Sequence, residues 1–171
     1  IQNPLNDPTT MTIKWWTTTA ATVDDHVDYG LTSGLGTTQA QTAPADCEST
    51  SAAGKCHRVD LTGLSANTLY YYQVSTNDVA LHAAGSSYTF QTLPATAPTT
   101  LTFAVLGDYG LDGASAGQLA VRDQLDAHGP YAFVLTPGDN AYSAGALEEW
   151  ESHVLKIYTA RLRDTPWFFA I

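Results

Sequence analysis

The hydrophobic pattern of the chain changes its period between residues 93 and 101, and this change constrains the fold more than any other feature. Before it, apolar and polar residues alternate in short segments such as 11–16 (Met-Thr-Ile-Lys-Trp-Trp). Alternation with a period of two predicts strands that bury one face. After it, continuous apolar runs alternate with helical patterns, which predicts a parallel sheet packed against helices. The sequence therefore predicts two domains of different classes.

Residues 1–93 form the first predicted domain, a β sandwich. About seven short strands, bounded by Gly, Ser and Pro turns, fit a domain of this length. The strongest signal is segment 64–74, in which a turn leads into a strand whose Tyr70 and Tyr72 share one face. This segment resembles the tyrosine corner of immunoglobulin-like sandwiches, with Tyr70 as the corner residue, and it favours a fibronectin type III-like fold. A ligand-binding platform is the alternative for these aromatic residues, but the period-two pattern favours a packed core.

Residues 94–100 form a short linker, and residues 101–171 form the second predicted domain. The linker carries two prolines, which stiffen it and prevent it from becoming a helix. Strands are predicted where the chain is most apolar and helices where helix formers recur, which gives strands at 101–106, 131–136 and 167–171 and helices at 114–128 and 147–162. We expect the first strand to be covered on both faces. Strand–helix–strand–helix–strand predicts the first half of an α/β domain, with the second half absent.

The charge of the chain limits its partners. The 171 residues carry a formal net charge of −10 at pH 7, so the surface repels polyanions, and nucleic acid is excluded as a default partner. No segment reaches the ~20 apolar residues of a membrane span. The chain begins at Ile1 rather than Met, which favours a processed, secreted extracellular protein.

The two cysteines, Cys47 and Cys56, flank a loop of polar and small residues. In an oxidising compartment this loop could be closed by a disulfide, which we prefer to two free thiols. A metal site is disfavoured because His57 is the only further ligand type beside them.

Two predicted strands run directly into Gly-Asp, which places Asp108 and Asp139 at strand ends. A single Gly-Asp pair is most often only a turn. In open α/β sheets, however, ligands collect at the carboxyl ends of the strands, and strands joined by one crossover are usually neighbours. Two converging carboxylates repel each other unless a cation lies between them, so the pair predicts a metal site. Tyr142 is close enough in sequence to join them, and a phenolate ligand calls for a strong Lewis acid such as ferric iron.

Segments 107–110 (Gly-Asp-Tyr-Gly) and 138–142 (Gly-Asp-Asn-Ala-Tyr) are similar to the first two sequence blocks of the purple acid phosphatases, which are calcineurin-like metallophosphoesterases. In the plant-type branch of this family the catalytic α/β domain follows a fibronectin-like sandwich. The resemblance implies hydrolysis of phosphate monoesters at a dinuclear centre of Fe(III) with Zn, Mn or Fe(II). It implies that Asp108 and Tyr142 bind the ferric ion and that Asp139 bridges both metals.

The remaining metal ligands and the catalytic histidine of the family are not present, and the resemblance places them beyond Ile171. Surface or locally bonded roles are expected for the histidines that are present, which are His26, His57, His82, His128 and His153. In one interpretation the chain is the N-terminal part of an acid phosphatase. It is then inactive alone and needs the remaining catalytic domain, or a partner chain, to cover its incomplete α/β half. In the other it is a non-catalytic extracellular structural, adhesive or assembly module.

Overall fold

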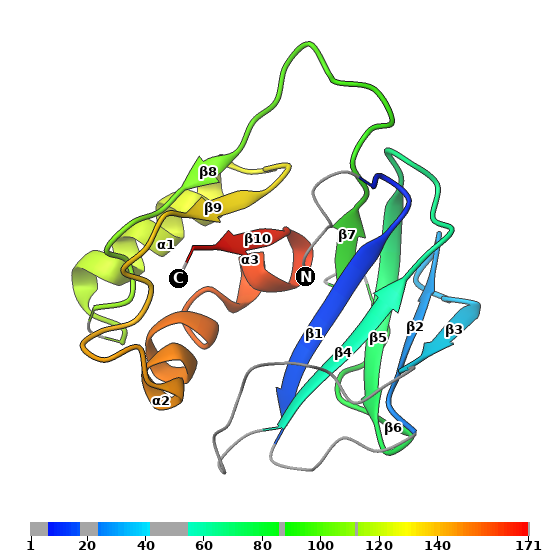
Figure 1. The fold of residues 1–171 in the computed structure, drawn as a ribbon, viewed down its shortest axis with the longest axis horizontal. Coiled ribbons are helices and arrows are strands. Elements are labelled where there is room, and N and C mark those ends of the chain that lie inside the picture. Colours follow the sequence, from blue (N-terminus) through cyan, green and yellow to red (C-terminus); the bar gives the residue numbers. More distant parts are fainter. Residues whose placement is uncertain (1–6, 18–23, 42–54, 86–87, 112, 171) are drawn as a thin grey trace. The chain divides into compact units, whose positions relative to one another are not determined.

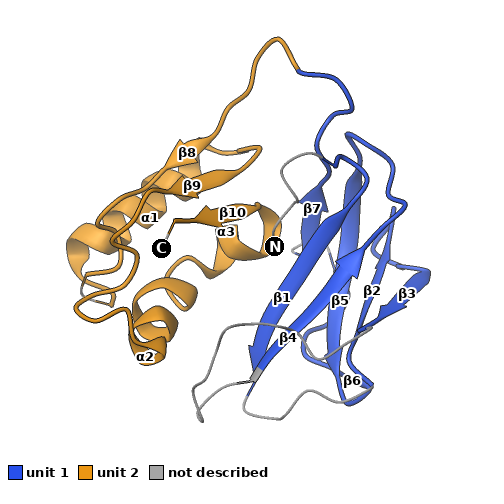
Figure 2. Cartoon of the chain, in the orientation of Figure 1, with its two compact units in different colours: residues 1–97 blue, residues 98–171 orange. Residues whose placement is uncertain are grey.

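The computed structural model describes residues 7–17, 24–41, 55–85, 88–111 and 113–170. The chain divides into two compact units, Ile1–Ala97 and Pro98–Ile171 (Figure 2).

The first unit is a β sandwich of two antiparallel sheets (Figure 1). Its described strands are β1 (Met11–Thr17), β2 (His26–Gly30), β3 (Thr37–Ala40), β4 (Lys55–Leu61), β5 (Leu69–Thr76), β6 (Val79–Ala80) and β7 (Thr89–Gln91). One sheet pairs β1 with β4, and the other has the order β3-β2-β5-β6, with β7 paired to β5. Residues from both sheets share one buried hydrophobic cluster, which defines the sandwich core.

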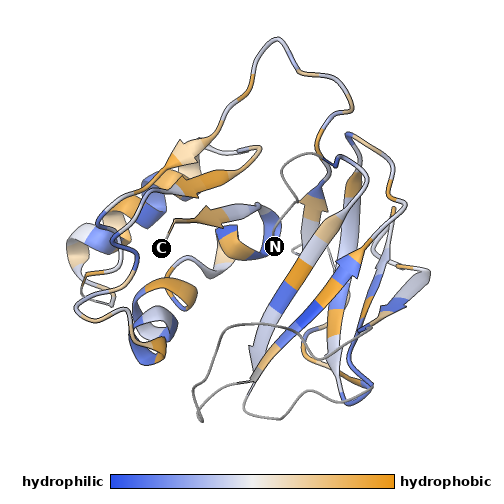
Figure 3. Cartoon of the chain, in the orientation of Figure 1, coloured by the Kyte–Doolittle hydropathy of each residue, from blue (hydrophilic) through white to orange (hydrophobic). Residues whose placement is uncertain are grey.

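The core of the sandwich follows the predicted alternation of apolar and polar residues. Trp15, Tyr70 and Tyr72 are buried in it, which confirms that these aromatic residues are core residues. Figure 3 shows the pattern as short alternating bands of hydropathy along the strands. The tyrosine corner is confirmed as well, because the backbone N–H of Ser65 donates to the Tyr70 hydroxyl oxygen at 2.9 Å.

His57 lies in the sandwich core, so the expected surface or local role for this histidine is wrong. Its side chain is 0% exposed, and its Nδ1 lies 2.7 Å from the equally buried carboxylate of Asp25. Its Nε2 lies 2.7 Å from the Thr17 hydroxyl, and its ring stacks on Trp15 with a centroid distance of 5.2 Å. The physical reason is strand phase, because His57 has the same parity in β4 as the buried residues Val59 and Leu61.

Cys56 lies in β4 opposite Trp16. Cys47 is outside the described residues, so the disulfide between the two cysteines stays a prediction.

The second unit contains a three-stranded parallel sheet and helices (Figure 1). Its elements are β8 (Ala104–Val105), α1 (Ala116–His128), β9 (Val134–Thr136), α2 (Leu147–Glu149), the π-helix η1 (Trp150–Leu155), α3 (Thr159–Asp164) and β10 (Trp167–Phe169). The strand order is β10-β9-β8, with Val134 of β9 paired to Trp167 on one side and to Ala104 on the other. Leu125 of α1, Val134 and Trp167 are buried in one cluster that holds the sheet and helices together.

The helix predicted over 147–162 is interrupted, which corrects the sequence expectation. The π-helix η1 and a turn at 156–158 separate α2 from α3. Two hydroxyls accompany the break: Ser152 donates to the carbonyl of Glu148 at 2.6 Å, and Thr159 donates to that of Leu155 at 2.8 Å. Bonds of this kind compete with the helical backbone ladder and bend helices.

The first strand of this unit was expected to be covered on both faces, and in the described residues it is not. Val105 is 56% exposed, and Phe103, just before the strand, is also exposed. The reason is the alternation along the strand, because Ala104 and Leu106 pack against the buried cluster and Phe103 and Val105 therefore lie on the other face of the sheet. Of the helices that the structure describes, none has the length and apolar character needed to cross a bilayer.

Candidate metal centre

The two predicted acids lie at the same edge of the parallel sheet. Since β8 and β9 are parallel neighbours, their carboxyl ends point the same way. Asp108 comes three residues after the end of β8, and Asp139 comes three residues after the end of β9. Both acids have a φ of 53°, a left-handed conformation that Asp tolerates better than most residues. The two loops therefore leave the sheet with the same backbone conformation at the acid.

Tyr142 completes the group, because its hydroxyl donates a hydrogen bond to Oδ1 of Asp108. The hydrogen bond to Asp108, then desolvation, then a hydrogen bond involving Asp139 raise the pKa of the Tyr142 phenol well above its ordinary value. Both carboxylates therefore act on one phenol. The structure brings together all three side chains that the sequence pointed to, and their role as metal ligands stays a prediction.

The chemistry of these donors fits a strongly Lewis-acidic cation. Two carboxylates beside one another favour a protonated phenol, as the raised pKa of Tyr142 shows. A bound cation reverses this preference, because its charge compensates the carboxylates and stabilises the phenolate. The described residues contain no group of three or more His, Cys, Asp or Glu side chains that could hold a metal ion.

Glu149 shapes the loop that follows Tyr142, and sequence reasoning missed it. Its carboxylate accepts hydrogen bonds from the backbone N–H groups of Ser143 at 2.5 Å, Ala144 at 3.0 Å and Ala146 at 3.0 Å. Desolvation acts to raise the pKa of Glu149, but these N–H donors outweigh it and lower the pKa below its ordinary value. Glu149 stands at the N3 position of α2, but Ala146 at the N-cap has no side-chain acceptor, so the sequence lacks the capping-box pattern that would have revealed this role.

His153 supports the other loop without joining the acids. Its Nδ1 lies 3.2 Å from the carbonyl oxygen of Gly110, and its ring packs against Gly113, where an added Cβ would lie 2.6 Å from ring atom Cδ2. His128, by contrast, is exposed and bonds to the carbonyl of Gln124 within its own helix, which confirms the local role expected for it.

Comparison with known proteins identifies the class. The family model for the purple acid phosphatase N-terminal domain matches residues 1–92, more than half of the chain. The chain therefore belongs to the purple acid phosphatase family.

Individual relatives agree with this assignment. The chain is 33% identical over 100 residues to Purple acid phosphatase 18 of Arabidopsis thaliana, which is 58% of this chain and 20% of that protein. The structure of purple acid phosphatase PPD1 from yellow lupin (Lupinus luteus) seeds superposes with a TM-score of 0.73 at 19% identity, over 96% of this chain and 33% of the lupin chain. The structure of PhoD superposes with a TM-score of 0.61 at 16% identity, over 96% of this chain and 37% of that one. At these identities the two structures show a shared fold. The matched segments thus cover between 20% and 37% of the length of these proteins.

Proposed function

We propose that this chain is the N-terminal part of a metal-dependent acid phosphatase that hydrolyses phosphate monoesters at a dinuclear centre. The observation that carries the proposal is the hydrogen bond from Tyr142 to Asp108 at the edge of the parallel sheet where Asp139 also follows its strand. Membership of the purple acid phosphatase family supports the reaction class.

The roles of the three residues follow from their positions. Asp108 and Tyr142, which are hydrogen-bonded to each other, would hold Fe(III). Asp139, from the neighbouring strand end, would bridge to the second ion, which is Zn, Mn or Fe(II). A dinuclear centre supplies Lewis acidity and neutralises the charge of the transferring phosphoryl group. Asp108 and Asp139 would thus gather positive charge at one place on a chain whose formal net charge is −10.

The domain assignment is part of the same proposal. Residues 1–93 would be the fibronectin type III-like N-terminal domain, 94–100 the linker, and 101–171 the N-terminal portion of a calcineurin-like metallophosphoesterase domain. The parallel order β10-β9-β8, with the acids after β8 and β9, supports the last assignment. We include secretion and a disulfide between Cys47 and Cys56 in the proposal.

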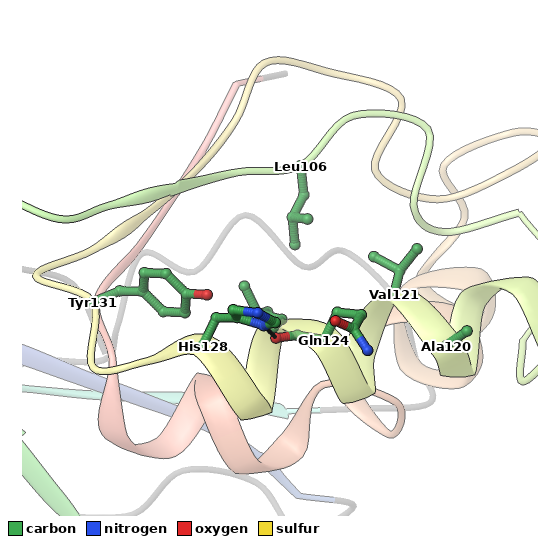
Figure 4. Close-up of a pocket in the computed structure, with 7 residues that line it drawn as sticks. Leu106, Ala120, Val121, Gln124, His128 and Tyr131 are labelled. Atoms are coloured by element: carbon green, nitrogen blue, oxygen red, sulfur yellow. Dashed lines mark hydrogen bonds between the residues drawn. The ribbon is translucent and has the colours of Figure 1, made fainter.

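An open apolar face of the second unit supports the need for further polypeptide. A cavity of about 400 Å³ lies between α1 and the end of β8 (Figure 4), lined by Leu106, Ala120, Val121, Gln124, Leu125, His128 and Tyr131. Val121, which lines this cavity, is 44% exposed. Exposed apolar surface of this kind marks an interaction site. The remaining catalytic domain, or a partner chain, would cover it and would supply the remaining metal ligands and catalytic residues.

The proposal is tested by loading the full-length encoded protein with iron and zinc and assaying p-nitrophenyl phosphate at acid pH. We expect turnover together with a visible charge-transfer band, and we expect Tyr142→Phe to remove the band. Residues 1–171 alone should show little or no turnover. A colourless full-length protein that binds no metal would contradict the proposal and favour a non-catalytic structural or adhesive module.

A further inference from the structure

We infer that Asn140 and Tyr109 are positioning residues that fix the two acid-bearing loops relative to each other and to the third strand. The inference rests on the proposed function, since it concerns the spacing of Asp108 and Asp139. Each of the two residues directly follows one of the acids in sequence. Neither of them belongs to the proposed donor set, and their side chains lie behind it in the protein interior.

The first contact joins the two loops through their side chains. The hydroxyl of Tyr109 donates a hydrogen bond to Oδ1 of Asn140 at 3.0 Å. Tyr109 is 5% exposed and Asn140 is 7% exposed, so water competes little for this bond. Since each partner is covalently next to an acid, a change in this distance changes the separation of the two carboxylates.

The backbones of the same loops are in direct contact. A Cβ on Gly110 would lie 1.7 Å from the carbonyl oxygen of Asn140, so only glycine allows this approach. The backbone N–H of Tyr142 donates to the carbonyl of Gly110 at 3.1 Å. The register of the two loops is therefore also set by the backbone of Gly110, the residue next to Tyr109.

The amide of Asn140 also reaches the end of the third strand. Its Nδ2 donates to the carbonyl of Ala170 at 2.7 Å, and the N–H of Ala170 in turn donates to the carbonyl of Thr136 in β9 at 2.8 Å. Asn140 thus links the carboxyl ends of β8, β9 and β10. A carbonyl oxygen that accepts from Tyr109 and an NH₂ that donates to Ala170 define one orientation of the amide. Asp cannot make the second bond, and an apolar residue can make neither.

Further contacts fix both the backbone and the ring of Tyr109. Nε2 of Gln118, in α1, donates to the Tyr109 carbonyl at 2.6 Å and to the His153 carbonyl at 2.6 Å. The ring of Tyr109 packs edge-on against Tyr158 at 5.4 Å and tilted against Trp167 at 6.1 Å. Because two neighbouring rings fix the orientation of the Tyr109 ring, its hydroxyl points in one direction. The bond to Asn140 therefore fixes the position of the loop of Asp139 relative to the loop of Asp108.

Iron binding to variants of the full-length protein tests this inference. We expect Asn140→Ala and Tyr109→Phe to weaken Fe(III) binding by about 10- to 100-fold and to shift or broaden the charge-transfer band, as loss of partners behind metal ligands does. The double variant should bind iron about as weakly as the single variant with the lower iron affinity, because both substitutions remove the Tyr109–Asn140 hydrogen bond. Asn140→Asp, which lacks the donor to Ala170, should also bind iron more weakly than the wild type. Thr165→Val is the matched control, since Thr165 is buried in the same unit and its hydroxyl donates at 2.7 Å to Asp164, which lies outside the two acid-bearing loops.

A second measurement does not depend on metal. In the metal-free protein, hydrogen exchange at the Tyr142 and Ala170 amides should be at least about 10-fold faster in Asn140→Ala than in the wild type and unchanged in Thr165→Val. If Asn140→Ala does not fold, Tyr109→Phe, which removes one oxygen atom, decides the question. Wild-type iron affinity and spectrum in both single variants would overturn the inference and leave the proposed function intact. A wild-type protein that binds no iron would overturn the proposed function and, with it, this inference.

Discussion

Replacement of Asp25 by alanine should be among the most destabilising single changes in the sandwich. Asp25 and His57 are both 0% exposed, and their side chains are 2.7 Å apart. The Asp25 carboxylate also accepts from the backbone N–H of Asn77 at 3.2 Å. Alanine would leave a buried imidazole and a backbone N–H without this acceptor, in a place where little water can replace it.

The expected loss of stability follows from the two donor groups that Asp25→Ala leaves without an acceptor. Two buried donors left without an acceptor cost ~1–3 kcal/mol each, so the expected loss of unfolding free energy is about 2–6 kcal/mol. A domain of this size loses roughly 4–8 °C in melting temperature for each kcal/mol, so we expect a drop of roughly 10–50 °C. That loss is a large fraction of the ~5–15 kcal/mol that stabilises a typical domain.

The assay is urea denaturation of the full chain, followed by hydrogen exchange of peptides from β5, which reports the first unit separately. Asp25→Asn keeps the shape and an acceptor oxygen, so it should fall between wild type and Asp25→Ala. Asp28→Ala is the control, because Asp28 lies in the partly exposed β2 and its hydrogen bond to Thr38 is at the surface. A loss below about 1 kcal/mol for Asp25→Ala, or one equal to that of Asp28→Ala, would refute the reasoning.

Three further predictions concern the loops and the cysteines. Glu149→Gln should lower the melting temperature at pH 7. The difference in melting temperature between wild type and variant should shrink as the pH falls below 4.5, the ordinary pKa of a glutamate, because the pKa of folded Glu149 is lowered and its contribution is lost when the carboxylate is protonated. A difference that persists at low pH would contradict this. Gly110→Ala should abolish iron binding by the full-length protein, since the added Cβ would overlap the Asn140 carbonyl; unchanged iron stoichiometry would show that the loops can separate without harm. Mass spectrometry of the protein produced in an oxidising compartment should find Cys47 and Cys56 in one cross-linked species that reduction splits. Two alkylatable thiols in the untreated protein would exclude the disulfide.

Much of the sandwich could be predicted because its signals are local. Alternation along β5 identifies Tyr70 and Tyr72 as inward-facing, and the corner hydrogen bond spans only five residues from Tyr70 to Ser65. The burial of His57 was missed because its neighbours in sequence are polar. Its parity with Val59 and Leu61 was available as a signal, but the partner Asp25 lies 32 residues away.

The position of Asp108 and Asp139 at neighbouring strand ends could be predicted from the sequence, whereas the residues that support the two loops could not. Asp108 and Asp139 each follow a glycine at a strand end, and this repeated pattern is visible in one dimension. In the sequence, Asn140 and Tyr109 occupy variable-looking positions within the two motifs. The contact that gives them a positioning role joins residues 31 positions apart, so no local pattern reveals it. The break in the second helix was missed for a related reason, because helical periodicity continues through Ser152 while its hydroxyl competes with the backbone ladder.

The left-handed backbone at both acids has a consequence for how these positions can vary. Asparagine and glycine accept this conformation but carry no charge, whereas glutamate carries the charge but enters the conformation less readily and is longer by one methylene. Aspartate alone among the common residues meets both demands. An exchange of Asp for Glu at position 108 or 139 is therefore a radical substitution in this protein, although most substitution scales rank it among the mildest.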